Sequence, residues 1–305
     1  METQLSTAPV SRWVRLRADL LLLLTAAIWG GAFVAQRMVA ADLGIFLFNG
    51  SRFLLGALAL LAILRFRFSI QRHNIKWVLL AGTVLFAASG FQQAGLITTT
   101  AGNAGFITSL YVVMIPLILR FVLGKRLTWS AWVAAGLAVA GALFLSTGGA
   151  LRLVAGDGLE LICALLFAIH VILVGKLVQH IPILEFSIGQ FIVCGVLNIL
   201  TGLLLERQSI PLLPGAWAPI AYAGILSVGA GYTLQAIGQR HAPPSDAAII
   251  LSMESVFAAL SGFLILGEDL TAVQIMGCVL ILAAILLAQI QPQKEGMFEK
   301  KSEDG

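Results

Sequence analysis

The chain is divided into ten apolar stretches of roughly 20 residues each, joined by short polar connectors. A helix needs about 20 apolar residues to cross a hydrocarbon core about 30 Å thick. The apolar residues make up 59% of the chain and the charged residues 11%, against about 45–50% and about 25% in soluble domains. The sequence therefore predicts an all-α, multi-pass membrane protein with ten transmembrane helices and no separate soluble domain. We expect these helices at residues 18–38, 44–64, 76–96, 101–122, 128–147, 156–176, 183–205, 216–237, 245–266 and 270–290.

Basic residues gather on one side of this predicted bundle. When the connectors are assigned to alternate sides, the opposite side receives only Arg37, Arg152 and Arg207. The side with many basic residues holds Arg12, Arg15, Arg17, Arg65, Arg67, Arg72, Lys76, Arg120, Lys125, Arg126, Lys176, Arg240, Lys294, Lys300 and Lys301. Because cytoplasmic connectors carry an excess of lysine and arginine, we expect a cytoplasmic (inner) membrane protein with both termini in the cytoplasm. Residues 1–17 and 291–305 are then cytoplasmic polar tails.

Two segments of the chain resemble each other at a fixed offset of 143 residues. Residues 103–137 align without gaps to residues 246–280, and the matching turns read GKRLT at 124–128 and GEDLT at 267–271. The turn is basic in one copy and acidic in the other, as expected if the two copies lie on opposite sides of the membrane. The pattern predicts two inverted five-helix repeats, at 18–147 and 156–290, an arrangement typical of secondary transporters. The other interpretation is an old duplication that is kept only for stability.

Several segments have the residue pattern of a known family. Residues 95–117 read GLITTTAGNAGFITSLYVVMIPL. This run resembles the fourth-helix region of EamA-type permeases of the drug/metabolite transporter superfamily. Ile28-Trp29-Gly30, Ser51-Arg52-Phe53 and the SMESVF segment at 252–257, followed by Gly267-Glu268, fit the same pattern, and the resemblance covers about residues 20–290. It implies a ten-helix fold with a substrate cavity between two four-helix halves, helices five and ten at the side, and export or exchange of metabolites such as amino acids. The family commonly has proline after the ninth-helix glutamate, whereas Ser255 stands there in this chain, so the resemblance gives no basis for a kink beside Glu254.

Glu254 and Tyr111 are the first candidates for a substrate or coupling site. Glu254 lies about nine residues into its span, roughly 13 Å deep at 1.5 Å per residue, close to the midplane. An ionisable group at that depth is costly and needs a reason. It suits proton coupling or the binding of a cationic group, and the alternative is a hydrogen-bonded carboxyl that ties helices together. Tyr111 occupies the same place in the first repeat, 143 residues earlier, and inverted repeats place such pairs at similar depth.

Five further residues complete the candidate set. Arg52 lies within the second span, where it could neutralise Glu254, attract an anionic substrate or lock its helix to a neighbour. His170 could relay protons or serve as a hydrogen-bonded packing residue. The weaker candidates, for which packing is the alternative to binding, are Trp29, Tyr232 and Gln235.

Some polar and small residues have structural interpretations. Asn103 and Asp246 stand at the starts of helices four and nine, where N-capping explains them. Pro116 predicts a bend in the fourth helix because it removes a backbone hydrogen bond. The spacing of Ala134, Ala138 and Ala142 is typical of close helix packing and leaves room for a homodimer contact.

Other functional classes lack their motifs. We find no serine-protease site, Asp-rich magnesium motif, HExxH zinc site or phosphate loop, and the three cysteines lie inside apolar runs. We therefore expect no catalytic residues, no cofactor, no metal and no nucleic-acid partner. The sequence predicts a secondary transporter for small amphipathic organic solutes, with a lipid bilayer, a small-molecule substrate and a homodimer as the partners to consider. A channel-like facilitator is the main alternative, followed by an intramembrane enzyme.

Overall fold

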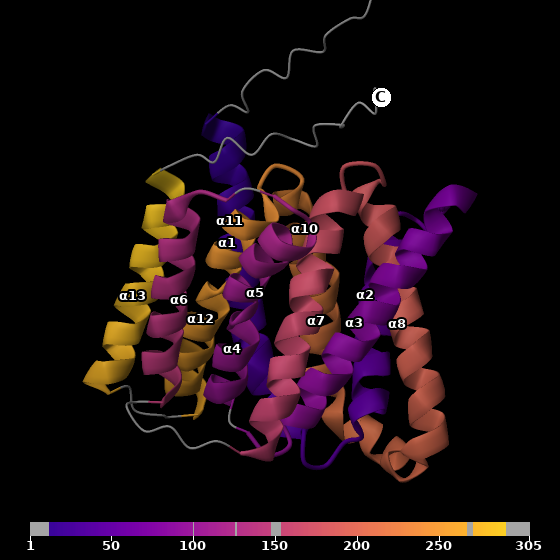
Figure 1. Ribbon diagram of the computed structural model, residues 1–305. Coiled ribbons are helices and arrows are strands. Elements are labelled where there is room, and N and C mark those ends of the chain that lie inside the picture. Colours follow the sequence, from indigo (N-terminus) through magenta and orange to yellow (C-terminus); the bar gives the residue numbers. More distant parts are fainter. Residues whose placement is uncertain (1–11, 100, 126, 148–153, 267–270, 291–305) are drawn as a thin grey trace, which may run out of the picture.

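The computed structural model describes residues 12–99, 101–125, 127–147, 154–266 and 271–290. The predicted tails at 1–11 and 291–305, the predicted outer residue Arg152 and most of the GEDLT turn, residues 267–270, lie outside the described residues, as does Arg126. Figure 1 shows the described helices as one upright bundle, in which α1 begins and α13 ends at the same end.

The described part of the chain forms ten membrane-crossing segments, as predicted. Eight are long and apolar enough to span a bilayer, and α6 and α13 are shorter apolar helices beside them. The first repeat contains α1 (Arg12–Val39), α2 (Ile45–Ile63), the short η1 (Arg72–Asn74) with α3 (Ile75–Gly95), a fourth segment, and α6 (Trp129–Thr147). The fourth segment consists of α4 (Ala101–Ser109), α5 (Tyr111–Leu117) and the π-helix η2 (Ile118–Val122). The second repeat begins with α7 (Ala155–Leu177) and α8 (Ile183–Leu205) and ends with α13 (Ala272–Ile290). Its eighth segment consists of η3 (Arg207–Ala216), α9 (Trp217–Ala221), the π-helix η4 (Tyr222–Tyr232) and α10 (Thr233–Gln239). Its ninth segment consists of α11 (Pro244–Leu251), α12 (Met253–Ser261) and the π-helix η5 (Gly262–Leu266).

The first helix is longer than predicted. It begins at Arg12 rather than at residue 18. Arginine and leucine, which dominate residues 12–17, are good helix formers. The apolar helix therefore continues through its basic flank.

Helix packing follows an inverted two-fold arrangement. Equivalent helices of the two repeats contact each other: α2 packs on α8 and α6 packs on α13. Contacts between non-equivalent helices occur twice, once in each direction. The third helix of the first repeat, α3, packs on the first helix of the second repeat, α7, and the third segment of the second repeat, the eighth of the chain, packs on α1. Figure 1 shows α6 and α13 side by side at one edge of the bundle. The other eight segments enclose the middle of the molecule.

The contact between α6 and α13 depends on small residues. A Cβ added at Gly141 would lie 2.7 Å from the Gly277 carbonyl oxygen, so the backbones approach closely. Ala134, Ala138 and Ala142 are buried within the chain. This stripe is therefore covered inside one molecule and gives no support for a contact between protomers.

The fourth and ninth segments each break within one residue of equivalent positions in the two repeats. The α-helix is interrupted at Leu110 in the first repeat and at Ser252 in the second. Beside these breaks, Ser109 Oγ donates to the Phe106 carbonyl at 2.7 Å, and Ser252 Oγ donates to the Ile249 carbonyl at 2.6 Å. Such serine bonds to the preceding turn bend helices. The ninth segment thus has a break beside Glu254 although it lacks the proline of the family pattern.

Proline has a separate effect in the fourth segment. Pro116 lies inside α5 and is followed directly by η2, where the backbone widens to π-helical hydrogen bonding. Proline has no backbone N–H, so one hydrogen bond of the helix is missing. The break itself, however, lies six residues earlier, at Leu110.

Candidate functional site

A small cavity lies between the two repeats in the middle of the bundle. Its volume is about 30 Å³, enough for about two water molecules. All seven candidate residues line it, namely Trp29, Arg52, Tyr111, His170, Tyr232, Gln235 and Glu254. They come from α1, α2, α5, α7, η4, α10 and α12. Both repeats therefore contribute to the cavity.

Tyr232 is the centre of an aromatic cluster on one wall. Its ring centroid lies 4.7 Å from that of Trp29 and 5.9 Å from those of His170 and Phe191. Trp29 is fixed from α1 because its Nε1 donates to the Ser227 carbonyl at 3.1 Å. These contacts pack the aromatic residues, as the structural alternative predicted, and also give the cavity an apolar, polarisable wall.

Arg52 is held by its own helix and by aromatic rings. Its Nε donates to Asn49 Oδ1 at 2.9 Å, and its guanidinium lies 5.1 Å from the ring centroid of Phe53 and 5.4 Å from that of Phe48. Asn49 in turn donates to the Ser89 carbonyl of α3 at 2.9 Å. Over the residues that the structure describes, Arg52 Nη2 has no hydrogen-bond partner and Arg52 forms no ion pair with Glu254. A buried guanidinium with an unused donor can bind an anionic group.

Glu254 and Tyr111 line the same cavity, one or two residues after the two helix breaks. Both are buried, with 3% and 2% of their surfaces exposed. Within the described ranges, Glu254 Oε1 and Tyr111 Oη have no hydrogen-bond partner. Buried polar atoms nearly always have a hydrogen-bond partner. Two such atoms without a partner at a cavity are therefore candidates for binding a ligand, a proton or water.

The sixth and eighth segments add partly bonded polar groups. His170 Nε2 lies 2.9 Å from Gln190 Oε1, which ties α7 to α8. Gln235 Nε2 donates to Gln239 Oε1 at 2.8 Å, and Gln239 donates to the Val171 carbonyl at 2.9 Å. In the described part of the chain, His170 Nδ1 and Gln235 Oε1 remain without partners. Each side chain thus has one structural contact and one atom left for the cavity.

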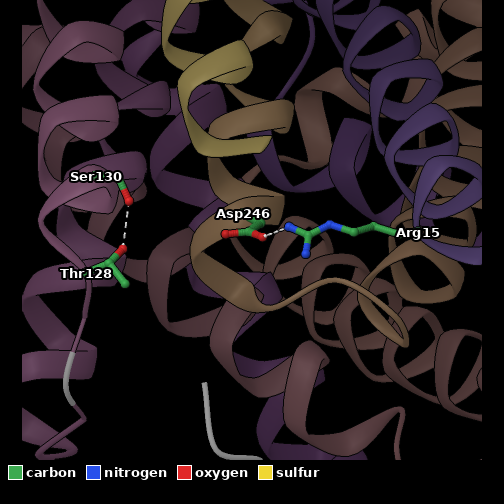
Figure 2. A network of polar contacts seen from close by, with 4 residues as sticks. All are labelled: Arg15, Thr128, Ser130 and Asp246. Atoms are coloured by element: carbon green, nitrogen blue, oxygen red, sulfur yellow. Dashed lines mark hydrogen bonds and ion pairs between the residues drawn. The ribbon is translucent and has the colours of Figure 1, made fainter. Parts of the chain in front are cut away.

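An ion pair links the two repeats at one end of the bundle. Arg15 Nη2 of α1 lies 2.6 Å from Asp246 Oδ2 of α11 (Figure 2). The prediction that Asp246 is a helix N-cap is wrong, because α11 begins at Pro244 with Pro243 as the N-cap residue. Asp246 lies in the first turn, where an acidic side chain is favourable. The side chain of Asn103, its counterpart, lies outside the described residues.

A second polar contact in Figure 2 belongs to the lateral helix α6. Thr128 Oγ1 and Ser130 Oγ are 2.9 Å apart at the beginning of this helix. Hydroxyls at a helix start satisfy backbone or side-chain donors that have no partner in the helix. This contact is local and separate from the Arg15–Asp246 ion pair.

Several lining residues were not identified from the sequence. Gln36, Gln92 and Thr108 line the cavity but were not among the candidates, and Arg52 adds the second helix to its lining. Polar but uncharged side chains are common in membrane helices, so type and position alone do not distinguish them. Gln36 lies seven residues after Trp29, and Thr108 lies three residues before Tyr111. Such helical spacing from a chosen candidate is the signal that could have found these two.

No cluster of three or more His, Cys, Asp or Glu side chains suited to a metal ion occurs in the described ranges. The three cysteines are free, and Cys163 and Cys194 are buried in the apolar core. The polar groups of the cavity come singly from different helices. This arrangement is typical of a small-molecule binding pocket.

Comparisons with known proteins agree with this architecture. The model of the EamA-like transporter family matches the chain twice, at residues 16–147 and 154–289. The chain belongs to the EamA-like transporter family. It is thus a multi-pass integral membrane transporter. A family member from Archaeoglobus fulgidus, named an uncharacterized transporter, is 32% identical over 281 residues, which cover 91% of this chain and 87% of that protein.

Two other relatives and one solved structure extend the comparison. The transporter YwfM of Bacillus subtilis is 26% identical, covering 92% of this EamA chain and 96% of its own. The threonine/homoserine exporter RhtA of Escherichia coli K12 is 33% identical over 76 residues, a quarter of each protein. A solved crystal structure matches the fold with a TM-score of 0.76 at 19% identity, covering 90% of this chain and 96% of that one.

Proposed function

We propose that this EamA family member is a secondary transporter that exports or exchanges small organic metabolites, amino acids or related amphipathic compounds, by alternating access. The observation that carries the proposal is the central cavity, which both repeats line and which contains unpartnered polar atoms. A transporter that alternates its access needs a site between two halves that move relative to each other.

The chemistry of the cavity suits a zwitterionic solute. Glu254 offers a carboxyl oxygen to an ammonium group, and Arg52 offers an unused guanidinium N–H to a carboxylate. Trp29 and Tyr232 supply an aromatic surface for the rest of the molecule. The RhtA similarity supports the amino-acid class, although it covers only a quarter of the chain.

The size of the cavity supports an occluded state in the cycle. A volume of about 30 Å³ holds water but not an amino acid, so the halves must separate before a metabolite enters. The ion pair between Arg15 and Asp246 closes the end that carries the excess of basic residues. On the positive-inside rule, this end faces the cytoplasm, with both termini, in the inner membrane.

Metabolite profiling with a Glu254→Gln variant tests the proposal. Medium and cytosol are compared for cells that contain equal membrane amounts of wild type, Glu254→Gln or Glu185→Gln. Glu185 lies in the first turn of α8 and does not line the cavity, so it provides a matched control. We expect certain metabolites to accumulate outside with wild type and the control but several-fold less with Glu254→Gln.

Counterflow in proteoliposomes separates a transporter from a channel-like facilitator. A labelled metabolite from the profile should enter faster when the unlabelled compound is trapped inside. An alternating-access carrier that has released the labelled molecule can then bind the unlabelled one and return its site to the outside. Entry that is independent of the trapped compound would contradict alternating access. Profiles that are identical for wild type and Glu254→Gln would instead remove Glu254 from the proposed site.

A further inference from the structure

A second buried carboxyl group lies behind the wall of the cavity. Glu160 of α7 is fully buried, and its Oε1 has no hydrogen-bond partner among the described residues. Its Oε2 accepts a hydrogen bond from Thr108 Oγ1 at 3.0 Å. Thr108 also lines the central cavity, together with Glu254. One hydroxyl therefore connects the buried carboxyl to the cavity.

The face of α7 that carries Glu160 leads from the helix start to the cavity. Asp157, Glu160, Ala164, Phe167 and Val171 are spaced by three or four residues, which puts them on one side of a helix. All five are buried, and the last two line the cavity. The two acids are thus the first members of a row that ends at the site.

The two acids have different surroundings. Asp157 accepts from Thr99 Oγ1 at 2.7 Å and from the Val154 backbone N–H at 2.8 Å, so both of its oxygens are bonded at the start of α7. Glu160 has only one bonded oxygen. Helix capping explains Asp157, whereas Glu160 has, besides Thr108, only the weak thiol donor of Cys163 beside it.

The groups around Glu160 carry no compensating positive charge. The titratable groups that face it are Asp157 and Cys163 on its own helix and Glu254 on α12. From α3 and α4 it meets Gly95, whose added Cβ would lie 2.7 Å from Oε1, and the neutral Thr108 hydroxyl. Over the described ranges, no basic side chain forms an ion pair with it. A carboxylate buried without a cation is costly, so such a group binds a proton or a cation.

We propose that Glu160 is a proton-carrying residue of the transport cycle, which exchanges protons with Glu254 through the Thr108 hydroxyl and cavity water; this inference rests on the proposed function. A proton that arrives from the end where α7 begins binds Glu160 Oε1 or Oε2. It then passes by way of Thr108 to water in the cavity and to the Glu254 carboxylate. Thr108 gives up one proton and takes another, so it ends each transfer unchanged.

Infrared spectroscopy tests Glu160 without any substrate. The protonated-carboxyl band of the full-length protein in lipid is recorded as the buffer is taken from acid to alkali. We expect Glu160→Gln to remove one titrating component of this band. Thr108→Val should shift that component because its hydrogen bond is lost, and Thr108→Ser should restore the wild-type position. A band that Glu160→Gln leaves unchanged, or a Glu160 component that does not respond to pH, would overturn the proposal.

Transport of a defined probe tests the coupling itself. With L-threonine as the probe and the membrane potential clamped at zero, one-for-one exchange with protons accumulates the solute about tenfold across one pH unit. Glu160→Gln should keep L-threonine counterflow but lose this accumulation, whereas Thr108→Ser should keep both. Accumulation that survives in Glu160→Gln, or that follows a sodium gradient at constant pH, contradicts a proton role. If wild type moves no L-threonine, the proposed amino-acid function fails for this probe, and the infrared result alone decides the role of Glu160.

Discussion

Polar atoms without partners concentrate around the central cavity. The described residues contain twelve buried side-chain N or O atoms without a hydrogen-bond partner, and six of them belong to lining residues. These six are Gln36 Oε1, Arg52 Nη2, Tyr111 Oη, His170 Nδ1, Gln235 Oε1 and Glu254 Oε1. An unsatisfied buried polar group costs about 1–3 kcal/mol. The site is therefore built at some expense of stability, which a bound ligand can recover.

Tyr111→Phe should separate binding from folding. The Tyr111 hydroxyl has no partner among the described residues, so its removal should leave the Tm equal or higher. If this hydroxyl contacts the solute, the KM for transport should rise several-fold while the amount of protein in the membrane stays constant. Thermal unfolding and initial transport rates measure the two effects.

Tyr222→Phe provides the matched control for this experiment. The Tyr222 hydroxyl donates to the Ile28 carbonyl at 3.0 Å, and the residue does not line the cavity. Its loss should cost about 0.5–1.5 kcal/mol of stability with an unchanged KM. A larger loss of Tm in Tyr111→Phe than in Tyr222→Phe would show that Tyr111 has a structural role instead.

The sequence indicates individual candidate residues more readily than their contacts. Glu254, Arg52 and His170 could be chosen because ionisable groups are rare in apolar spans. Glu160 satisfies the same rule, but it lies near the start of its predicted span, where solvation also explains a charge, so the rule does not single it out. Pairwise contacts such as that between His170 and Gln190 depend on how helices distant in the sequence pack, which periodicity does not determine.

At the scale of helices, small residues decide which elements can meet. Gly30 of α1 lies against the Phe257 and Ala258 backbone and side-chain atoms of α12, with no space for a Cβ. The glycine beside Trp29 therefore places the first helix against the one that carries Glu254.

Gly141→Leu tests the contact between α6 and α13. A Cβ at this position would lie 2.7 Å from the Gly277 carbonyl oxygen and 2.9 Å from Ile281 Cγ1, so a leucine must separate the helices. We expect a loss of about 1–3 kcal/mol, seen as a lower Tm in detergent. Gly136→Leu is the control, because nothing lies within 4 Å of a Cβ there. Equal Tm values for the two variants would contradict the packing described for α6.

Helix irregularity was the part of the elements least accessible from sequence. Apolar length predicts a span but does not say where its hydrogen bonding changes. The π-helix η4 ends at Tyr232, and its residues, Tyr222–Tyr232, include no proline that would indicate a change in the helix. Pro116 indicated an irregularity in the fourth segment, but the break there lies beside the Ser109 hydrogen bond rather than at the proline.

For the whole molecule, the span count and the repeat were predictable because both leave periodic patterns. Ten apolar runs and the 143-residue offset gave the ten helices and the inverted relation. The cavity was not predictable in size or closure, because these depend on the relative position of the two halves.

A reducible cross-link between the halves should stop transport. Cysteines placed at Arg15 and Asp246, in a protein whose native cysteines are replaced, join α1 to α11 where the ion pair lies. If this end opens during the cycle, a short bifunctional thiol reagent should abolish transport and a reductant should restore it. Single-cysteine variants treated in the same way are the controls. Full transport in the cross-linked protein would show that this end stays closed.

The contacts α2–α8 and α6–α13 have a consequence for how variation accumulates in this chain. Each joins elements that hold the same place in the two repeats, which is how the two copies of one surface meet in an isologous dimer. The molecule is thus a homodimer-like pair fused into one polypeptide, whose two copies are free to diverge. In a true homodimer a mutation changes both sides of the axis at once. Here Glu254 could arise opposite Tyr111, and a symmetric pocket could become one that distinguishes the two ends of its solute.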